Sequence, residues 1–162
     1  MLELLKETDP ILKQLAENWD FEQHLNAAVV EQEMLETMKA HNGIGLAANQ
    51  VGLLRRVFVM QTQDNRQFGC FNPWILFGDN NLIEDREGCL SFPELWLKVP
   101  RHDKITAAYL DNTGKQCIIE LEGIDARCFQ HELDHLNGIT FTEHVSALKL
   151  QMARKKQRKI NG

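Results

Sequence analysis

Two histidines and one glutamate in the last third of the chain have the spacing of a metal site. His131, Glu132 and His135 form the pattern His-Glu-x-x-His. On a helix, residues four apart lie one turn apart on the same face, so both imidazoles can bind one metal ion. Glu132 projects beside them as a candidate general base. The alternative is a buried structural helix with two incidental histidines, and the surrounding sequence favours the metal site.

This motif lies in a segment with the features of a helix. Asp125 stands where an N-cap residue is expected, and Gly138 stands where a helix ends. Ile124 and Cys128 continue the stripe of the two histidines at helical spacing. The sequence therefore predicts a helix that directs both imidazoles toward one site.

A catalytic metal site needs a third protein ligand and an open position for water. One large group of zinc peptidases provides it by continuing the pattern as His-x-x-Gly-x-x-His. Here Gly138 matches, but Phe141 stands at the position of the third histidine and cannot bind a metal. Glu143 and His144 follow beyond the expected end of the helix. The third ligand must therefore be sought elsewhere in the chain.

Among the four cysteines, Cys89 is the best third ligand by elimination. Cys117 lies within a predicted strand, Cys70 lies in a run that resembles core, and Cys128 is on the metal helix itself, where it would pack as a small apolar residue. Only Cys89 occupies a predicted loop, where Gly88 leaves room for close approach. The alternative for Cys89 is an ordinary buried thiol.

Length and composition indicate a globular protein. The chain has 162 residues, with 43% hydrophobic and 25% charged residues, which suits one domain with a proper core. No apolar run approaches the roughly 20 residues of a membrane span. The first nine residues contain acids where a signal peptide has bases. We therefore expect a cytoplasmic protein without a membrane segment, whose cysteines are thiols or ligands and form no disulfides.

Charge is distributed unevenly along the chain. The net charge is −5, but residues 145–162 contain six Lys or Arg and no Asp or Glu. Residues 1–144 therefore carry a charge of −11. An acidic body repels nucleic acid, whereas a basic tail attracts it.

The elements that must position the metal site indicate an α+β fold. Residues 21–41 have the pattern of an amphipathic helix. Short β-branched and aromatic runs after residue 55 alternate with turn residues, which indicates strands. The expected strands are 56–60, 68–71, 75–77, 82–84, 105–110 and 116–121, the last two forming a hairpin. The buried face of the first helix is expected to contain Leu25, Ala28, Val29, Gln32, Leu35 and Met38.

We expect these elements to form a single domain over residues 1–162. Antiparallel strands in small sheets would pack around the central metal-binding helix. An N-terminal helix would precede them, and a basic helix at residues 145–160 would end the chain, with Ser146 near its cap. Leu148 and Met152 are the residues of this last helix expected to pack on the body.

A glycine-rich segment follows the first helix. Residues 43–48 fit the dinucleotide fingerprint Gly-x-Gly-x-x-Ala, with Asp64 near the expected acidic position. That fingerprint requires a strand before it and a helix after it, and the order here is reversed. The better interpretation is a tight backbone segment that lets a ligand approach, with Gln50 offering an amide donor.

Three segments together resemble the peptide deformylase family. That family carries Gly-x-Gly-x-Ala-Ala-x-Gln, then Glu-Gly-Cys-Leu-Ser, then Gln-His-Glu-x-Asp-His. The matching segments here are residues 43–50, 87–91 and 130–135, in the same order and at similar spacing. The likeness runs from about Thr8 to the end of the chain.

The resemblance implies removal of the formyl group from N-formylmethionine on new polypeptides. By this likeness, Cys89, His131 and His135 bind one divalent metal ion, with a water in the fourth position. The family's usual metal is ferrous iron, and zinc, nickel or cobalt can substitute. The ligand types alone suit both zinc and ferrous iron, so the sequence leaves the native metal open.

The resemblance also assigns catalytic roles. Glu132 would take a proton from the attacking water and return it to the departing amine. The side-chain amide of Gln50 and the backbone N–H of Leu90 would stabilise the tetrahedral oxyanion.

A substrate pocket follows from the same likeness. Ile44, Ile124 and Cys128 are candidates to line the apolar pocket for the methionine side chain. Gly43 and Gly45 would let the substrate backbone approach. Two departures from the family pattern affect this region: Arg127 replaces an aliphatic residue found in some members, and Trp96 replaces an arginine found in several bacterial members.

The expected partners are N-formylmethionyl peptides on nascent chains. The basic terminal helix is expected to dock on the ribosome, as in similar deformylases, or else to be a solvated helix face. We expect a monomer. The competing interpretations are a metallopeptidase, which would need a third ligand after the helix, and a structural metal domain or inactive relative, in which Glu132 would have no role.

Overall fold

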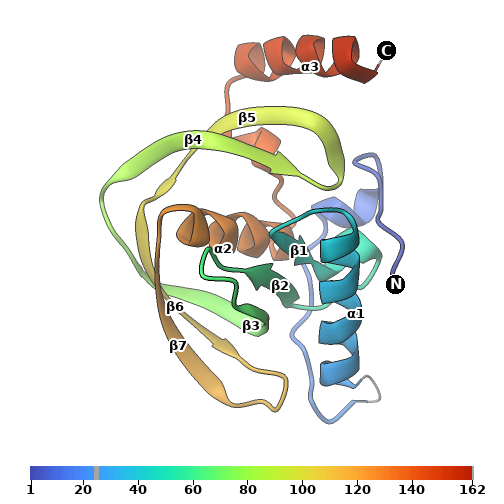
Figure 1. The fold of residues 1–162 in the computed structure, drawn as a ribbon, viewed down its shortest axis with the longest axis vertical. Helices are drawn as coiled ribbons and strands as arrows, with labels where there is room; N and C mark the ends of the chain where they lie inside the picture. The colour runs from blue at the N-terminus through green and yellow to red at the C-terminus, as the bar shows by residue number, and fades with distance from the viewer. Residues whose placement is uncertain (24–25, 162) are drawn as a thin grey trace.

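The computed structural model describes residues 1–23 and 26–161. It has an α+β fold with antiparallel sheets and three α-helices, as predicted (Figure 1). The helices are α1 (Ala27–Ala40), α2 (Gly123–Leu136) and α3 (Ala147–Asn161), and the 3-10 helices are η1 (Pro10–Lys13), η2 (Ala48–Val51) and η3 (Phe141–His144). The strands are β1 (Gly45–Ala47), β2 (Val57–Gln61), β3 (Gln67–Gly78), β4 (Leu82–Cys89), β5 (Phe92–His102), β6 (Lys104–Leu110) and β7 (Gln116–Glu122).

Five strands form the main sheet in the order β1-β2-β3-β6-β7, all antiparallel. Successive residues of β2 point to opposite faces of this sheet. Val57 and Val59 pack in the cluster that contains α1, whereas Phe58 and Met60 pack in the cluster that contains α2. All four side chains are fully buried, so the sheet is covered on both faces at this strand.

Strands β4 and β5 form a separate two-stranded ribbon that curves over α2 (Figure 1). The ribbon has a small core of its own, in which Leu95, Leu97 and Val99 of β5 pack with Phe141. The helix α3 lies against β5 on the far side of the molecule from the main sheet (Figure 1). The helix α2 thus lies between the ribbon and the main sheet, which brings both groups of strands next to its side chains.

The start of α2 differs from the expected one. The helix begins at Gly123, and Asp125 lies in its first turn rather than at the N-cap. The Asp125 carboxylate accepts a hydrogen bond from the backbone N–H of Gln63 at 3.0 Å instead. The expected end is correct: Gly138 adopts a φ of 73°, a left-handed conformation that glycine tolerates and that stops a helix.

The first helix is shorter than predicted and is rotated. It begins at Ala27 rather than near residue 21, because the Asn26 side chain caps the N–H groups of the first turn. Leu35 and Met38 are buried as predicted, but Val29 is 53% exposed. Leu25 lies outside the described residues. The buried stripe consists mainly of Ala27, Val30, Met34 and Met38.

The ribbon was largely missed by the strand prediction. Residues 68–71 and 75–77 belong to one strand, β3, with a register shift at Asn72 and Pro73 that accommodates the missing N–H of proline. Strand β4 continues beyond residue 84 to Cys89, so this cysteine ends a strand instead of lying in a loop. Strand β5 was not predicted. The hairpin of β6 and β7 was predicted correctly.

The terminal helix packs through a different face from the one expected. Leu148 and Met152 are 65% and 56% exposed, whereas Leu150 and Ala153 pack against the core of the ribbon. Arg154 forms an ion pair with Glu7 of the N-terminal arm at 2.6 Å. No helix within the described residues is long and apolar enough to cross a membrane.

Candidate metal centre

The structure brings three potential metal ligands together from two elements. Cys89 ends β4, and His131 and His135 lie one turn apart on α2. Their donor atoms lie within 4.8 Å of one another, the sole such cluster among the residues described. Cys70 and Cys117 lie in β3 and β7 and are not part of it.

The geometry of these donors fits a metal ion. The Cys89 Sγ and His135 Nε2 atoms are 3.4 Å apart. Tetrahedral bonds of roughly 2.3 Å to sulfur and 2.0 Å to nitrogen would separate two such atoms by about 3.5 Å. A thiolate and two imidazoles suit zinc and ferrous iron. The side chains present are therefore compatible with the metal that the motif predicts.

A buried carboxylate orients the first histidine. Glu87 on β4 accepts a hydrogen bond from His131 Nδ1 at 2.8 Å, which leaves the Nε2 lone pair available as a ligand. The same carboxylate accepts hydrogen bonds from Arg101 Nε and Nη2 at 2.9 and 3.0 Å, and from Arg127 Nη1 at 2.8 Å. Burial alone would raise the pKa of Glu87, but the hydrogen bonds from His131 and Arg101 outweigh it and lower this pKa to about 2.

This network extends to the surface. Arg101 Nη1 donates to Asp134 Oδ2 at 2.6 Å, and His144 Nε2 lies 2.7 Å from the same oxygen. The Arg101 side chain is only 5% exposed, so its charge is compensated by two carboxylates within the protein. Sequence reasoning missed the roles of Glu87 and Arg101. The signal for Glu87 was its position in the family-like segment of residues 87–91.

Glu132, the candidate general base, directly follows His131 on α2. Its side chain is buried, and Oε1 has no hydrogen-bond partner among the described residues. Burial raises the pKa of Glu132 to about 7. Gly45 lies directly against it: a Cβ at position 45 would be 2.5 Å from Glu132 Oε2 and 2.8 Å from the Cys128 sulfur. Glycine at position 45 is therefore required by the contact with α2.

Gln50 points its amide nitrogen at the site. Its Oε1 accepts a hydrogen bond from the Ala47 backbone at 2.9 Å, so Nε2 faces the other way. That nitrogen donates to Ser91 Oγ at 3.1 Å and lies 3.5 Å from Cys89 Sγ. Leu90 and Ser91 form the two-residue turn between β4 and β5. Leu90 therefore directly follows the cysteine, at the start of this turn.

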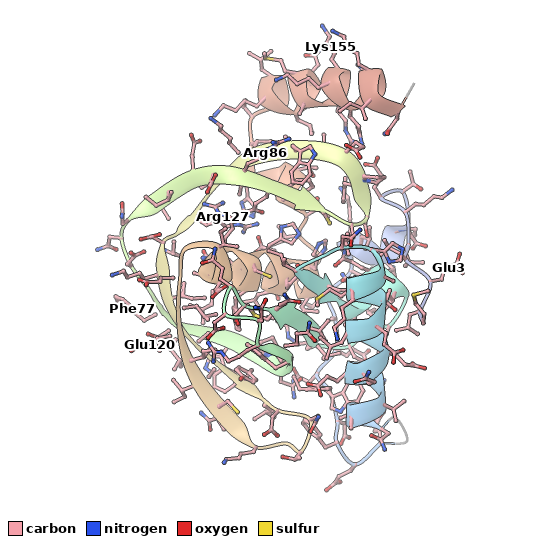
Figure 2. The ribbon with its side chains drawn as sticks, in the orientation of Figure 1. Glu3, Phe77, Arg86, Glu120, Arg127 and Lys155 are labelled. Atoms are coloured by element: carbon pink, nitrogen blue, oxygen red, sulfur yellow. The ribbon has the colours of Figure 1, made fainter. Side chains whose placement is uncertain are left out.

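The predicted substrate residues surround one cavity of about 760 Å³. Ile44 and Ile124 are about half exposed on its wall, and Cys128 is buried. The Arg127 guanidinium is turned away toward Glu87 and the carbonyls of Ile83 and Val99, between α2 and the ribbon (Figure 2). Except for the fully buried His135, all predicted site residues line this cavity, namely Gly43, Ile44, Gly45, Gln50, Cys89, Leu90, Ile124, Arg127, Cys128, His131 and Glu132.

Comparison with known proteins identifies the family. The sequence model of the polypeptide deformylase family matches residues 1–151 of this chain. The chain belongs to this family. Over 149 residues it is 40% identical to the peptide deformylase of Thermotoga maritima, covering 91% of this chain and 89% of that one. A crystal structure of a peptide deformylase from Legionella pneumophila superposes with a TM-score of 0.90 at 35% identity, covering 99% and 95% of the two chains.

Deformylases of this family are metal-dependent hydrolases. The chain accordingly removes the formyl group from the N-terminal methionine of nascent peptides. The cluster of one cysteine and two histidines is a possible site for the metal. The alternatives of a metallopeptidase, a structural metal domain and a nucleotide-binding protein are wrong.

Proposed function

We propose that Cys89, His131 and His135 hold one divalent metal ion and form the catalytic centre of deformylation. The observation that carries this proposal is the convergence of their donor atoms within 4.8 Å, next to a buried carboxylate with an unpartnered oxygen. When bound, the metal supplies Lewis acidity, which activates a water and polarises the formyl oxygen. The central helix α2 would then be the metal-binding helix of the fold.

Glu132 moves the proton in this proposal. Its Oε1 takes a proton from the attacking water and later gives it to the departing amine of methionine. The pKa of about 7 suits a group that must both accept and release a proton near neutral pH. The buried surroundings also exclude bulk water that would compete for this oxygen.

Gln50 and Leu90 stabilise the oxyanion. The hydrogen bond from Ala47 fixes the Gln50 amide, so Nε2 is oriented before the substrate arrives. Leu90 follows Cys89 directly in a tight turn, so its backbone N–H would lie beside the reacting carbonyl. Ser91 positions Gln50 by accepting its hydrogen bond at 3.1 Å.

The substrate lies in the cavity between two free strand edges. Among the described residues, β1 pairs only with β2 and β4 only with β5, so each has an edge that can bind an extended peptide. The methionine side chain enters the apolar part formed by Ile44, Ile124 and Cys128, with the stem of Arg127 beside it. Gly43 lies close to the β4–β5 turn, because a Cβ at position 43 would be only 2.7 Å from Leu90 Cδ1. Glycine at this position therefore leaves room for the substrate.

The metal we propose is ferrous iron, with zinc, nickel and cobalt as substitutes. Thiolate and imidazole ligands suit all four ions, and iron is the usual metal of similar deformylases. Anaerobically purified protein should release formate from formyl-Met-Ala-Ser and contain about one iron per chain. The iron form should lose activity in air faster than a nickel-exchanged form, because oxidants attack a thiolate beside an accessible iron. Equal lifetimes in air would contradict iron as the working metal.

We also propose the setting in which the enzyme acts. It would function as a monomer and a single domain over residues 1–162, in the cytoplasm, on peptides that emerge from the ribosome. The basic residues of α3 would contact ribosomal RNA. Lys155 projects from the outer side of α3, away from the body, which supports this docking (Figure 2).

The decisive test is substrate identity. Formate release from formyl-Met-Ala-Ser should far exceed the hydrolysis of an internal peptide bond in the same peptide. Removal of the metal by a chelator should abolish formate release, and re-addition of ferrous iron or nickel under anaerobic conditions should restore it. A metal-free protein of full activity would exclude the proposed centre.

A further inference from the structure

The outer wall of the cavity carries an arginine that the catalytic site does not use. Arg86 on β4 and Trp96 on β5 both line the cavity, outside the part assigned to methionine. The Arg86 guanidinium carbon lies 4.5 Å from the centroid of the Trp96 ring. Arginine stacks well on an aromatic face, and such a stack restricts its rotamers. Figure 2 shows Arg86 on the β4–β5 ribbon, apart from the buried Arg127.

Arg86 has no acidic ion-pair partner among residues 1–23 and 26–161. The neighbouring Asp85 carboxylate accepts a hydrogen bond from the Arg86 backbone N–H at 2.8 Å. Arg86 is therefore an exposed, oriented cation at the mouth of the cavity.

Trp96 lies next to the catalytic centre. A Cβ at Gly88 would be 2.6 Å from Trp96 Cζ3, so the indole covers the residue that precedes Cys89. With glycine at position 88, the ring lies flat against the backbone of β4 where this strand passes the cavity. An extended peptide on the edge of β4 would therefore meet Trp96 and Arg86 within about one residue of its reacting end.

The pleat of the ribbon determines which substrate side chain meets this pair. Glu87 points toward α2, because it contacts His131, and neighbouring residues in a strand point to the opposite face. Gly88 and Arg86 thus face away from α2. In an extended peptide the methionine side chain enters the cavity toward α2, so the side chain of the next residue points away from α2. That second side chain faces Arg86 and Trp96.

We propose that Arg86, held by Trp96, selects substrates with an acidic residue directly after formylmethionine. This inference rests on the proposed function, since it assumes that the peptide binds along β4. An Asp or Glu carboxylate would pair with the guanidinium while its methylene groups lie on the indole. A Lys or Arg at the same position would be repelled. The contact is exposed to solvent, so the discrimination is modest, about two- to fivefold in kcat/KM for each charge relative to a neutral residue.

The test compares three peptides that differ only in charge. Formyl-Met-Glu-Ser, formyl-Met-Gln-Ser and formyl-Met-Lys-Ser are used as C-terminal amides, so that no terminal carboxylate competes for Arg86. We expect kcat/KM in the order Glu, Gln, Lys at low salt, with the ratio approaching one in 1 M salt because exposed charges are then screened. Equal values for the three peptides at low salt, with formate released from each, would overturn this inference alone. No formate from any of them would contradict the proposed function instead.

Two variants and one control assign the effect to Arg86. Arg86→Gln should bring the ratio of the Glu to the Lys peptide close to one, and Arg86→Glu should reverse it. Lys98 is the control, because it lies opposite Arg86 in the ribbon but does not line the cavity. Lys98→Gln should retain the parental ratio. An unchanged ratio in both Arg86 variants, or its loss in Lys98→Gln, would show that a general surface charge causes the preference.

Discussion

The helix α2 and the β4–β5 ribbon contribute to the proposed metal site in two different ways. The helix contributes three functional groups within five residues and is packed against the main sheet through Phe129 and Leu136. The ribbon contributes one sulfur at the end of a strand and has only a small core of its own. Side-chain spacing on the helix is therefore set by its own backbone, whereas the position of Cys89 depends on how the ribbon is attached.

Ion pairs are a large part of this attachment. Glu87 on the ribbon accepts hydrogen bonds from His131 and Arg127 on α2, and Arg101 on the ribbon contacts Asp134 on α2. All of these groups except the partly buried Asp134 are buried, so their charges rely on their partners for compensation. One half of the proposed site is thus fixed by the local geometry of α2, whereas the other half depends on ion pairs between distant segments.

Removal of the single ligand on the ribbon should have the largest effect. Cys89→Ala should abolish metal retention and turnover together, because two imidazoles alone would remain. The matched control is Cys117→Ala, which removes a thiol from β7 outside the cluster and should retain both properties. Metal content by elemental analysis and formate release are the measurements. Stoichiometric metal in Cys89→Ala would remove this residue from the ligand set.

Loss of the carboxylate on the helix should affect chemistry and leave the metal in place. Glu132→Ala should lower kcat by about 10²–10⁴-fold, as expected for a general acid–base group. Metal content should stay near that of the parent, because Glu132 is not a ligand in the proposed centre. Turnover close to the parental value would exclude Glu132 as the proton carrier.

Weakening of the ribbon's attachment should have an intermediate effect. Glu87→Gln keeps the shape of the side chain but removes the charge that Arg101, Arg127 and His131 share. We expect metal affinity or activity to fall about 10–100-fold, as is typical when the partner of a metal-binding histidine is changed. Glu84→Gln, on the exposed part of the same strand, should behave like the parent. Parental metal affinity in Glu87→Gln would show that helix packing alone positions the ligands.

Changes in α3 should have the smallest effect on catalysis. They can distinguish the contribution of this helix to stability from the contribution of its positive charge to ribosome binding. Removal of residues 147–162 exposes the core of the ribbon, and loss of the Leu150 contacts alone should lower the free energy of unfolding by about 2 kcal/mol. This corresponds to a decrease in Tm of roughly 4–8 °C for a chain of this size. Turnover of a short formyl peptide should change little.

Neutralisation of exposed lysines isolates the role of charge in α3. Lys155, Lys156 and Lys159 are exposed, so their joint replacement by Gln should leave Tm and turnover near parental values. Co-sedimentation with ribosomes at low salt should nevertheless weaken, because fewer counterions are released from RNA phosphates on binding. Ribosome binding equal to that of the parent would exclude α3 as the docking element.

Local patterns in the sequence predicted the parts of the molecule that depend on near neighbours. The alignment of His131 and His135 on one face requires only a helix, and the β6–β7 hairpin requires only two strands and a turn. Elimination and family resemblance led to the proposal of Cys89 as the cysteine ligand. The segment around it was predicted as a loop but is the end of a strand.

Only the tertiary structure revealed what holds the two halves of the site together. Glu87 and His131 are 44 positions apart, and Arg101 and Asp134 are 33 apart, so no local periodicity marks either pair. The requirement for Gly45 likewise comes from Glu132 and Cys128, which approach it from another element. Spacing along one helix follows from backbone geometry, which the sequence determines by itself. Contacts between α2 and the ribbon depend on ion pairs between residues far apart in the sequence. These pairs form only in the folded tertiary structure.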